Sequence, residues 1–428
     1  MDSEKMSGRE NKTENENKSA DILYTLVLLT LPGIGPSRYW QLIDLFGSAK
    51  QVLYADIASL PKAVPSSTMG IIQQLQNNFE SHRYTSQVKN EIEWCYENNV
   101  RTLSVDDRDY PSLLSKIHSP PPVLYVKGDI NNLSLPQLAV VGSRNPTPAG
   151  KENAFHFSKE LVKTGFSITS GLALGIDASA HLGALSGGNH AKGKTIAVLG
   201  TGIDKIYPQR HRQLVSDIVE NGGAIVSEFA VGVGPHASNF PRRNRVISGL
   251  SLGVLVVEAA VKSGSLITAR LAMEQDREVF ALPGSIHNPL SRGSHSLIKN
   301  GAQLVEQVSD LQESLQGLLE YKKHELHSEN TIEMTGNIND DNLCDEDNQI
   351  EKKCEESISK EEQEILDAIG FDETSFDVLA ARLEYETGEL LSALMTMELR
   401  GLILPTATGY MRATINTTIS TTMNRAIN

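Results

Sequence analysis

The sequence predicts an α/β protein: a Rossmann-like, doubly wound, mostly parallel sheet, flanked by an N-terminal helical domain and a C-terminal winged-helix-like domain. The first observation is that, between residues 137 and 306, short apolar runs alternate with helical patterns of about ten to fifteen residues. The second is that these runs are almost continuously apolar, which is typical of strands covered by helices on both faces. The third is that glycines follow the runs, where the chain turns toward the next helix.

The composition indicates a multidomain protein of the cytoplasm. The chain has 428 residues, of which 39% are hydrophobic, enough to bury a large core. Its polar start lacks the apolar run of a signal peptide, and the ten residues of ILYTLVLLTL are too few to span a membrane. The 3 cysteines are scattered without a CxxC spacing, so we expect no disulfide framework, no metal site and no cofactor held by thiols.

The pattern of order and polarity divides the chain into successive segments. The first ordered one contains Gly33 and Gly35 in a tight turn that resembles a helix-hairpin-helix, or SAM-like, turn; the simpler alternative is a helical turn that needs glycine. We expect the following segments: a disordered tail at 1–20, a helical domain at 21–85, a mixed connecting segment with a short strand at 86–136, the Rossmann-like domain at 137–306, an acidic linker at 307–360, a winged-helix-like domain at 361–413 and a tail at 414–428.

Charge is distributed unevenly along this chain, whose net charge is −14. Residues 139–306 contain 17 basic and 12 acidic residues, whereas residues 307–360 contain 5 basic and 14 acidic ones. The middle of the chain therefore suits a polyanionic partner better than the total charge suggests. In the C-terminal domain, the second of two expected helices carries Glu389 and Glu398 against Arg400, which favours a protein contact over DNA.

The stretch GNHAKGKT, residues 188–195, matches the Walker A pattern, with Lys194 and Thr195 at the phosphate and magnesium positions. A functional P-loop needs a strand before the loop and a helix after it, so that the helix N-terminus faces the phosphates. Here a helical pattern precedes the loop and the β-branched run TIAVLG follows it. We therefore expect a surface loop and no ATP hydrolysis.

Four other loops follow strands and precede helices, at the sheet edge where such folds bind ligands. Glycines there let the backbone approach an anion, arginines supply positive charge, and an aromatic ring offers a face for a base. The simpler alternative is that the arginines form surface ion pairs and the ring belongs to the core. The candidate residues are Gly142, Arg144, Gly171, Gly175, Asp177, Arg210, Arg212, Phe240, Arg242, Arg243, Arg245, Lys262, Ser263, Gly264 and Ser265, with Tyr207 near the mouth.

Asp177 and His181 lie four residues apart on one expected helix. This spacing would allow them to act as a base and its orienting carboxylate. More often, such a pair only fixes a helix to a loop.

Several long stretches resemble the DNA-processing protein A family (DprA/Smf): VVGSRNPTPAG, TSGLALGIDASAH, TIAVLGTGIDKIYP and NFPRRNRVISGLSLGVLVVEAAVKSGSLITARLAMEQDREVFALPGS. The resemblance extends over about residues 22–412. It implies a non-catalytic protein without a cofactor that binds and protects incoming single-stranded DNA during natural transformation, forms a homodimer through the Rossmann-like domain and loads the RecA recombinase. We therefore expect residues 137–306 to bind single-stranded DNA.

The resemblance also adds residues to the expected DNA site. It implies Ser143, Asn244 and the loop 171–177, and we include Ser170 at the end of the preceding strand. One departure is His211, which stands where the family usually has asparagine in the pattern Y-P-x-x-N-x-x-L, and this puts one loop contact in doubt.

A nucleoside monophosphate phosphoribohydrolase-like enzyme is the main alternative, because related Rossmann-like proteins catalyse that cleavage. Those enzymes use a P-G-G-x-G-T loop followed by a glutamate. Here the turn is KSGS at residues 262–265, and Thr268 follows instead of an acid, so that Glu258 is the nearest carboxylate. A structural or adaptor role for the whole chain is the third hypothesis.

Overall fold

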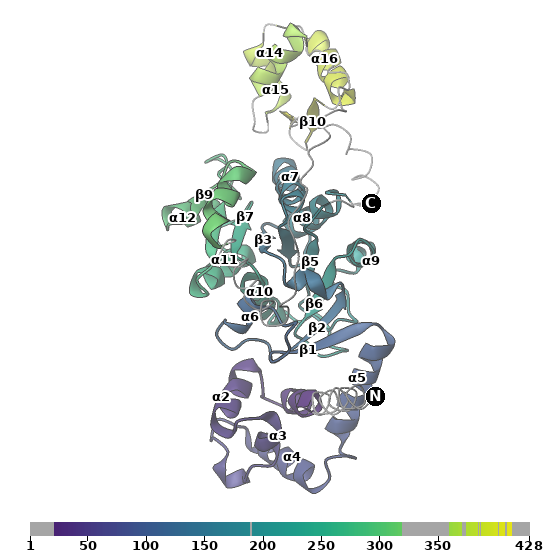
Figure 1. Cartoon of the computed structure of the whole chain (residues 1–428). Coiled ribbons are helices and arrows are strands. Elements are labelled where there is room, and N and C mark those ends of the chain that lie inside the picture. The colour runs from purple at the N-terminus through teal and green to yellow at the C-terminus, as the bar shows by residue number, and fades with distance from the viewer. Residues whose placement is uncertain are drawn as a thin grey trace, which may run out of the picture. The chain divides into compact units, whose positions relative to one another are not determined.

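The computed structural model describes residues 21–188, 191–318, 359–369, 374–383, 385, 387–400, 402–406 and 409–412. The chain divides into two compact units, Met1–Met334 and Thr335–Asn428, which are described separately (Figure 1). Among the described residues, no helix is long and apolar enough to cross a membrane.

A nine-stranded sheet forms the centre of the first unit, in the order β1-β2-β6-β5-β4-β3-β7-β8-β9 (Figure 1). Its strands are β1 (Val100–Ser104), β2 (Val123–Gly128), β3 (Gln137–Val141), β4 (Ser167–Ser170), β5 (Thr195–Val198), β6 (Ala224–Ser227), β7 (Gly253–Val256), β8 (Glu278–Ala281) and β9 (Gln303–Leu304). All neighbours from β6 to β9 in this order are parallel. Strands β3 to β9, which correspond to the apolar runs of residues 137–306, thus form the parallel sheet that the sequence predicts.

Strands β1 and β2 lie in residues 86–136, which we expected to be a mixed connecting segment with one short strand; β2 is that strand. β1 pairs antiparallel with β2, and β2 pairs antiparallel with β6. The expectation of a separate connecting segment is therefore wrong, because these residues complete one edge of the sheet. A single short apolar run does not show which strand it will pair with, so the sequence pattern gave no indication of this.

Helices cover both faces of the sheet, as expected for a doubly wound fold. One face packs against α6 (Ser112–Ser115), α10 (Asn239–Leu250), α11 (Gly264–Glu274) and α12 (Ser291–Lys299), which share a buried cluster with strand residues such as Val141 and Val256. The other face packs against α7 (Pro148–Lys163) and α8 (Ile176–Leu185), through a cluster that includes Leu138 and Phe280. Between β5 and β6, the chain forms η3 (Gln209–His211) and α9 (Arg212–Glu220).

The expected linker begins with structure that belongs to the first unit. Residues 308–318 are helical, and Leu311 and Leu315 are fully buried in the same cluster as α7 and α8. The predicted boundary at residue 307 is therefore wrong, because apolar residues four apart place one face of this helix on the core. Residues 319–358 of the expected linker lie outside the described residues, as do the two expected tails.

The N-terminal part of the first unit is helical, as predicted. Residues 21–30 are helical and are followed by α2 (Pro36–Phe46), α3 (Ala49–Leu53), η1 (Ile57–Ser59), α4 (Ser66–Asn77) and α5 (Arg83–Glu97). The turn before α2 contains Gly33 in a conformation with φ 76°, which favours glycine. Trp40 Nε1 donates to the Pro120 carbonyl at 2.7 Å, and the Tyr125 hydroxyl on β2 donates to Glu91 on α5 at 2.7 Å. After β2, the short helix η2 (Ile130–Leu133) leads the chain into β3.

The second unit contains α14 (Lys360–Ile369), α15 (Phe376–Arg382), α16 (Thr387–Leu399), β10 (Ile403–Pro405) and β11 (Tyr410–Arg412). β10 and β11 pair antiparallel, and the three helices share a core that includes Leu366, Leu379 and Leu394. This is a winged-helix arrangement, as predicted, with one more helix than the two we expected from the pattern.

Candidate nucleic-acid interface

A cavity of about 530 Å³ lies beyond the carboxyl ends of β3 and β7, next to the first turns of α10 and α11. Ten of the expected site residues line it: Gly142, Ser143, Arg144, Asp177, Phe240, Arg243, Asn244, Ser263, Gly264 and Ser265. The topology brings them together because parallel strands end at the same edge, so loops far apart in sequence meet there.

Two glycines allow these loops to come close enough to enclose the cavity. A Cβ atom added at Gly142 would lie 2.6 Å from Ile176 Cγ1 on α8. Gly175 has φ 80°, and an added Cβ there would lie 2.4 Å from the carbonyl oxygen of Ser143. The close packing of the two loops therefore requires glycine at both positions.

An aromatic ring flanked by a cation forms one wall of the cavity. The Arg144 guanidinium lies over the Phe240 ring at 5.7 Å from its centre, and the rings of Phe240 and Tyr207 are also 5.7 Å apart. The Tyr207 side chain is 46% exposed. Ring and guanidinium faces of this kind can stack an unpaired base while the positive charge attracts its phosphate.

Arg243 lies beneath the cavity and is almost completely buried, with 4% of its surface exposed. Its Nη1 atom donates to the Val198 carbonyl at 2.8 Å. Burial lowers the pKa of Arg243 to about 10, which still leaves the guanidinium charged at neutral pH. Its charge favours ionised Asp177, whose pKa burial raises, and Asp177 accepts the amides of Gly171 and Ala173 at 3.1 and 3.2 Å. Asp177 thus holds the loop after β4 in place above the charged guanidinium group of Arg243.

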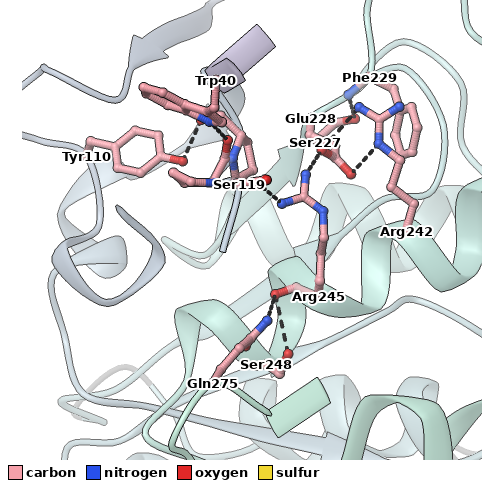
Figure 2. Close-up of polar contacts among 12 residues, drawn as sticks. Trp40, Tyr110, Ser119, Ser227, Glu228, Phe229, Arg242, Arg245, Ser248 and Gln275 are labelled. Atoms are coloured by element: carbon pink, nitrogen blue, oxygen red, sulfur yellow. Dashed lines mark hydrogen bonds and ion pairs between the residues drawn. The ribbon is translucent and has the colours of Figure 1, made fainter. Parts of the chain in front are cut away.

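Arg242 and Arg245 point away from this cavity, so the three adjacent arginines do not share one site. Both form ion pairs with Glu228, whose side chain is 2% exposed, and Arg245 also donates to the Ser119 carbonyl at 2.7 Å (Figure 2). Successive residues of a helix point in directions about 100° apart, so Arg242, Arg243 and Arg245 leave α10 on different sides. We did not predict from the sequence that Glu228, the residue directly after β6, would be the partner of these arginines.

The other expected residues lie around the cavity without lining it. Arg210, Arg212 and Lys262 are exposed outside it. Ser170 is buried and donates to the Val140 carbonyl at 2.7 Å, so it supports the loop rather than facing a ligand. Gly171 and Gly175 also belong to this supporting layer.

His211, which departs from the family pattern, contacts the neighbouring loop. Its Nδ1 lies 2.9 Å from the carbonyl oxygen of Leu172 and donates to it, since a carbonyl can only accept. The histidine therefore joins the loop after β5 to the loop after β4.

The structure does not form an acid–base pair from Asp177 and His181. His181 Nδ1 lies 2.7 Å from Thr195 Oγ, which donates to the Ile168 carbonyl and thus accepts from the ring. Asp177 turns back to the amides of Gly171 and Ala173 instead, because these N–H groups of the loop after β4 need an acceptor. Asp177 and His181 therefore fix α8 to its neighbouring segments, which is the second of the two roles considered from the sequence.

The Walker-like stretch has the order of elements that the sequence predicts. Helix α8 precedes it and β5 follows it, while residues 189–190 lie outside the described residues. The hydroxyl of Thr195, at the magnesium position, is buried and already bonded to Ile168. This stretch therefore cannot form a P-loop.

The carboxylate of Glu258, considered for the alternative hydrolase, also has partners. It accepts the backbone N–H and the hydroxyl of Thr147 at 2.9 and 2.6 Å and is 8% exposed. Glu258 thereby holds the start of α7, and it does not line the cavity. Among the described residues, no group of three His, Cys, Asp or Glu side chains is placed to hold a metal ion.

Comparison with known proteins assigns this arrangement to a family. A family model described as DNA recombination-mediator protein A matches residues 101–316, which is half of the chain. The chain belongs to that family. A model of the DprA winged helix domain matches residues 352–407 as well.

Individual relatives agree with the family assignment over most of their length. Protein Smf of Escherichia coli is 41% identical over 338 residues, covering 78% of this chain and 84% of that protein. Protein Smf of Synechocystis is 34% identical over 396 residues, covering 89% and 96%. The solved structure of DNA processing protein A from Streptococcus pneumoniae has a TM-score of 0.57 and 34% identity, covering 68% of this chain and 96% of that one.

Proposed function

We propose that this family member is a non-catalytic protein that binds and protects incoming single-stranded DNA and loads the RecA recombinase during natural transformation and DNA recombination. The observation that carries the DNA-binding part is the Arg144–Phe240 pair above buried Arg243, in a cavity surrounded by glycine loops. Family membership supports the role in recombination, including the partnership with RecA.

A single strand fits this cavity better than a duplex does. The bases of a duplex are stacked on one another, so they cannot lie on the exposed faces of Tyr207 and Arg144. The cavity is also a recess between loops and the first turns of α10 and α11, and such a recess receives an unpaired base, whereas duplex readout needs an element that projects into a groove.

The absence of catalysis is supported by the state of the nearby carboxylates. Of the described residues that line the cavity, Asp177 is the one acid, and it already accepts two backbone amides. Glu258 is engaged with Thr147. A hydrolase would need one of these carboxylates free to act on the sugar or a water.

The decisive experiment measures affinity for single-stranded and duplex DNA of equal length, beside ATP turnover and nucleoside monophosphate cleavage. We expect tighter binding of the single strand and neither enzymatic activity. Phe240→Leu should lose about 1–3 kcal/mol of single-strand binding, whereas Phe240→Tyr should retain most of it. Equal affinity for both DNA forms, or measurable cleavage of the monophosphate, would overturn the proposal.

The proposed homodimer is supported by apolar side chains at the β9 end of the sheet. Met273 on α11 and Leu304 on β9 are 44% and 43% exposed, and a dimer interface at this end would remove both from water. Leu304→Asp should convert a dimer into a monomer in light scattering. If the unchanged protein is already monomeric at micromolar concentration, the dimer is excluded.

A further inference from the structure

A second cavity of about 530 Å³ lies between the N-terminal helices and the sheet. Its apolar wall includes Leu26 and Leu29 from the first helix, Val123 from β2 and Phe229 after β6. Its polar lining residues include Gln87 on α5, Arg242 on α10 and Glu228 after β6, whose side chain is buried. We call this cavity the interdomain groove.

The border of the interdomain groove carries a guanidinium group that shares its carboxylate partner with a second arginine. Two guanidinium groups, those of Arg242 and Arg245, share the single carboxylate of Glu228 (Figure 2). Arg242 donates to Glu228 through Nε at 3.1 Å and Nη2 at 3.3 Å. These three groups together carry one net positive charge, while the next carboxylate, that of Glu91, accepts the Tyr125 hydroxyl and the Val231 N–H in the groove wall. Because Arg242 is 39% exposed and Arg245 only 15%, this charge is most accessible at Arg242, in the groove.

Arg242 also has a fixed orientation. Its guanidinium lies over the Phe229 ring at 4.9 Å from the centre, and Phe229 itself is buried (Figure 2). Carboxylate and ring together hold the planar group in place, so little side-chain freedom is lost when a ligand binds. A fixed guanidinium plane can bind a phosphate or stack on an unpaired base.

The first turn of α10 contributes residues to both cavities. Phe240 and Pro241 line the first cavity, and the next residue, Arg242, lines the interdomain groove. A strand with a base on Phe240 would therefore meet Arg242 immediately on the other side of this turn.

We propose that the interdomain groove is a second subsite for the same single strand, in which Arg242 binds a phosphate and the apolar wall contacts the base. This inference rests on the proposed DNA-binding function and extends it from one cavity to a path across α10. An acidic peptide from another protein is the competing occupant, but it would not explain why the groove adjoins the first cavity.

The test uses Gln87, an exposed residue of the groove whose replacement leaves the buried ion pairs intact. The full-length protein carries Gln87→Lys or Gln87→Glu, and affinity is measured for oligothymidylates of about 5 and about 25 nucleotides. Gln87→Lys should tighten and Gln87→Glu should weaken binding of the long oligonucleotide, each by roughly two- to five-fold, which is the effect of one partly screened charge. Binding of the short oligonucleotide should not change, since it fills only the first cavity.

The same exchanges at Gln73, which is exposed on α4 outside both cavities, provide the matched control and should have no effect. Arg242→Gln should weaken binding of the long oligonucleotide selectively, whereas Arg144→Ala should weaken both. No effect of either Gln87 variant, or equal effects on both lengths, would overturn the second subsite and leave the first intact. Failure of the unchanged protein to bind either length would instead overturn the proposed function.

Discussion

The guanidinium of Arg243 fills the space beside Gly171, where an added Cβ atom would lie 1.8 Å from Nη1. No side chain at residue 171 is compatible with this position of Arg243. The glycine therefore serves to let a buried cation reach the floor of the DNA-binding cavity, which is distinct from giving the loop flexibility.

Gly171→Ala should displace Arg243 and weaken both folding and DNA binding. We expect a loss of about 1–3 kcal/mol in the free energy of unfolding, as for other overpacked sites, and a clearly lower affinity for single-stranded DNA. Gly70→Ala is the control, because Gly70 is exposed on α4 outside the cavity and no atom lies within 4 Å of the added Cβ. Thermal melting and fluorescence anisotropy measure the two effects, and similar results for both variants would contradict this role of Gly171.

Arg144→Ala should reduce the salt dependence of single-strand binding. Each lost phosphate contact lowers the slope of log affinity against log salt by about 0.7. Arg212→Ala removes the same charge at an exposed position outside the cavity and serves as the control. A titration from low to high salt gives the slopes. If Arg212→Ala changes the slope more than Arg144→Ala does, the strand lies on the α9 side instead.

Acid should destabilise the first unit through His181. Burial lowers the pKa of this side chain to about 3, whereas the value in an unfolded chain is about 6.5. Between these values only the unfolded state takes up the proton. The free energy of unfolding therefore falls as the pH decreases from about 6.5 toward 3, by up to about 1.4 kcal/mol per pH unit.

His181→Leu should remove about 2 kcal/mol of the stability loss between pH 7 and pH 5, because the leucine does not titrate. Urea unfolding at the two pH values measures the change, and His156→Leu, at an exposed position of α7, is the control. An equal loss in the unchanged protein and in His181→Leu would show that other groups cause the acid sensitivity.

The winged-helix unit should not contribute to DNA affinity. Residues 361–413 contain 3 arginines and 11 acidic residues. Each arginine is engaged within the unit: Arg382 with the Ala368 carbonyl, Arg400 with Glu362 and Arg412 with Asp367. A chain ending at residue 334 should bind single-stranded DNA at least as tightly as the full chain, with the largest gain at low salt. Weaker binding by the shorter chain would show that the winged helix contacts DNA.

The parallel sheet and its cavity could be predicted because their signals are local. Most strands of the Rossmann-like domain are apolar runs followed by a loop that contains glycine, and the topology of such folds brings those loops to one edge. Gly142, Arg144 and Phe240 were found in this way and do line the cavity. The reversed order of elements around Thr195 was equally visible in the sequence.

The distribution of the arginines could not be predicted, because it depends on contacts between distant segments. Arg245 reaches the Ser119 carbonyl, 126 positions away, and Arg242 faces Glu228. Helical periodicity predicts that neighbouring residues diverge, but it does not show which of them faces the ligand. Strand β1 and the place of β2 in the sheet were missed for a similar reason, since the pairing of β2 with β6 joins residues about a hundred positions apart.

The pairing of β2 with β6 has a consequence for any attempt to prepare the Rossmann-like domain alone. A fragment that starts at residue 137 lacks β2, so the N–H and C=O groups of Ala224–Ser227 on that side lose their partners. All four residues of β6 are buried in the intact protein, and the fragment would present them as an open, apolar strand edge. Such edges recruit strands from other molecules. The smallest fragment that remains soluble without aggregating should therefore begin before Val100 rather than at Gln137.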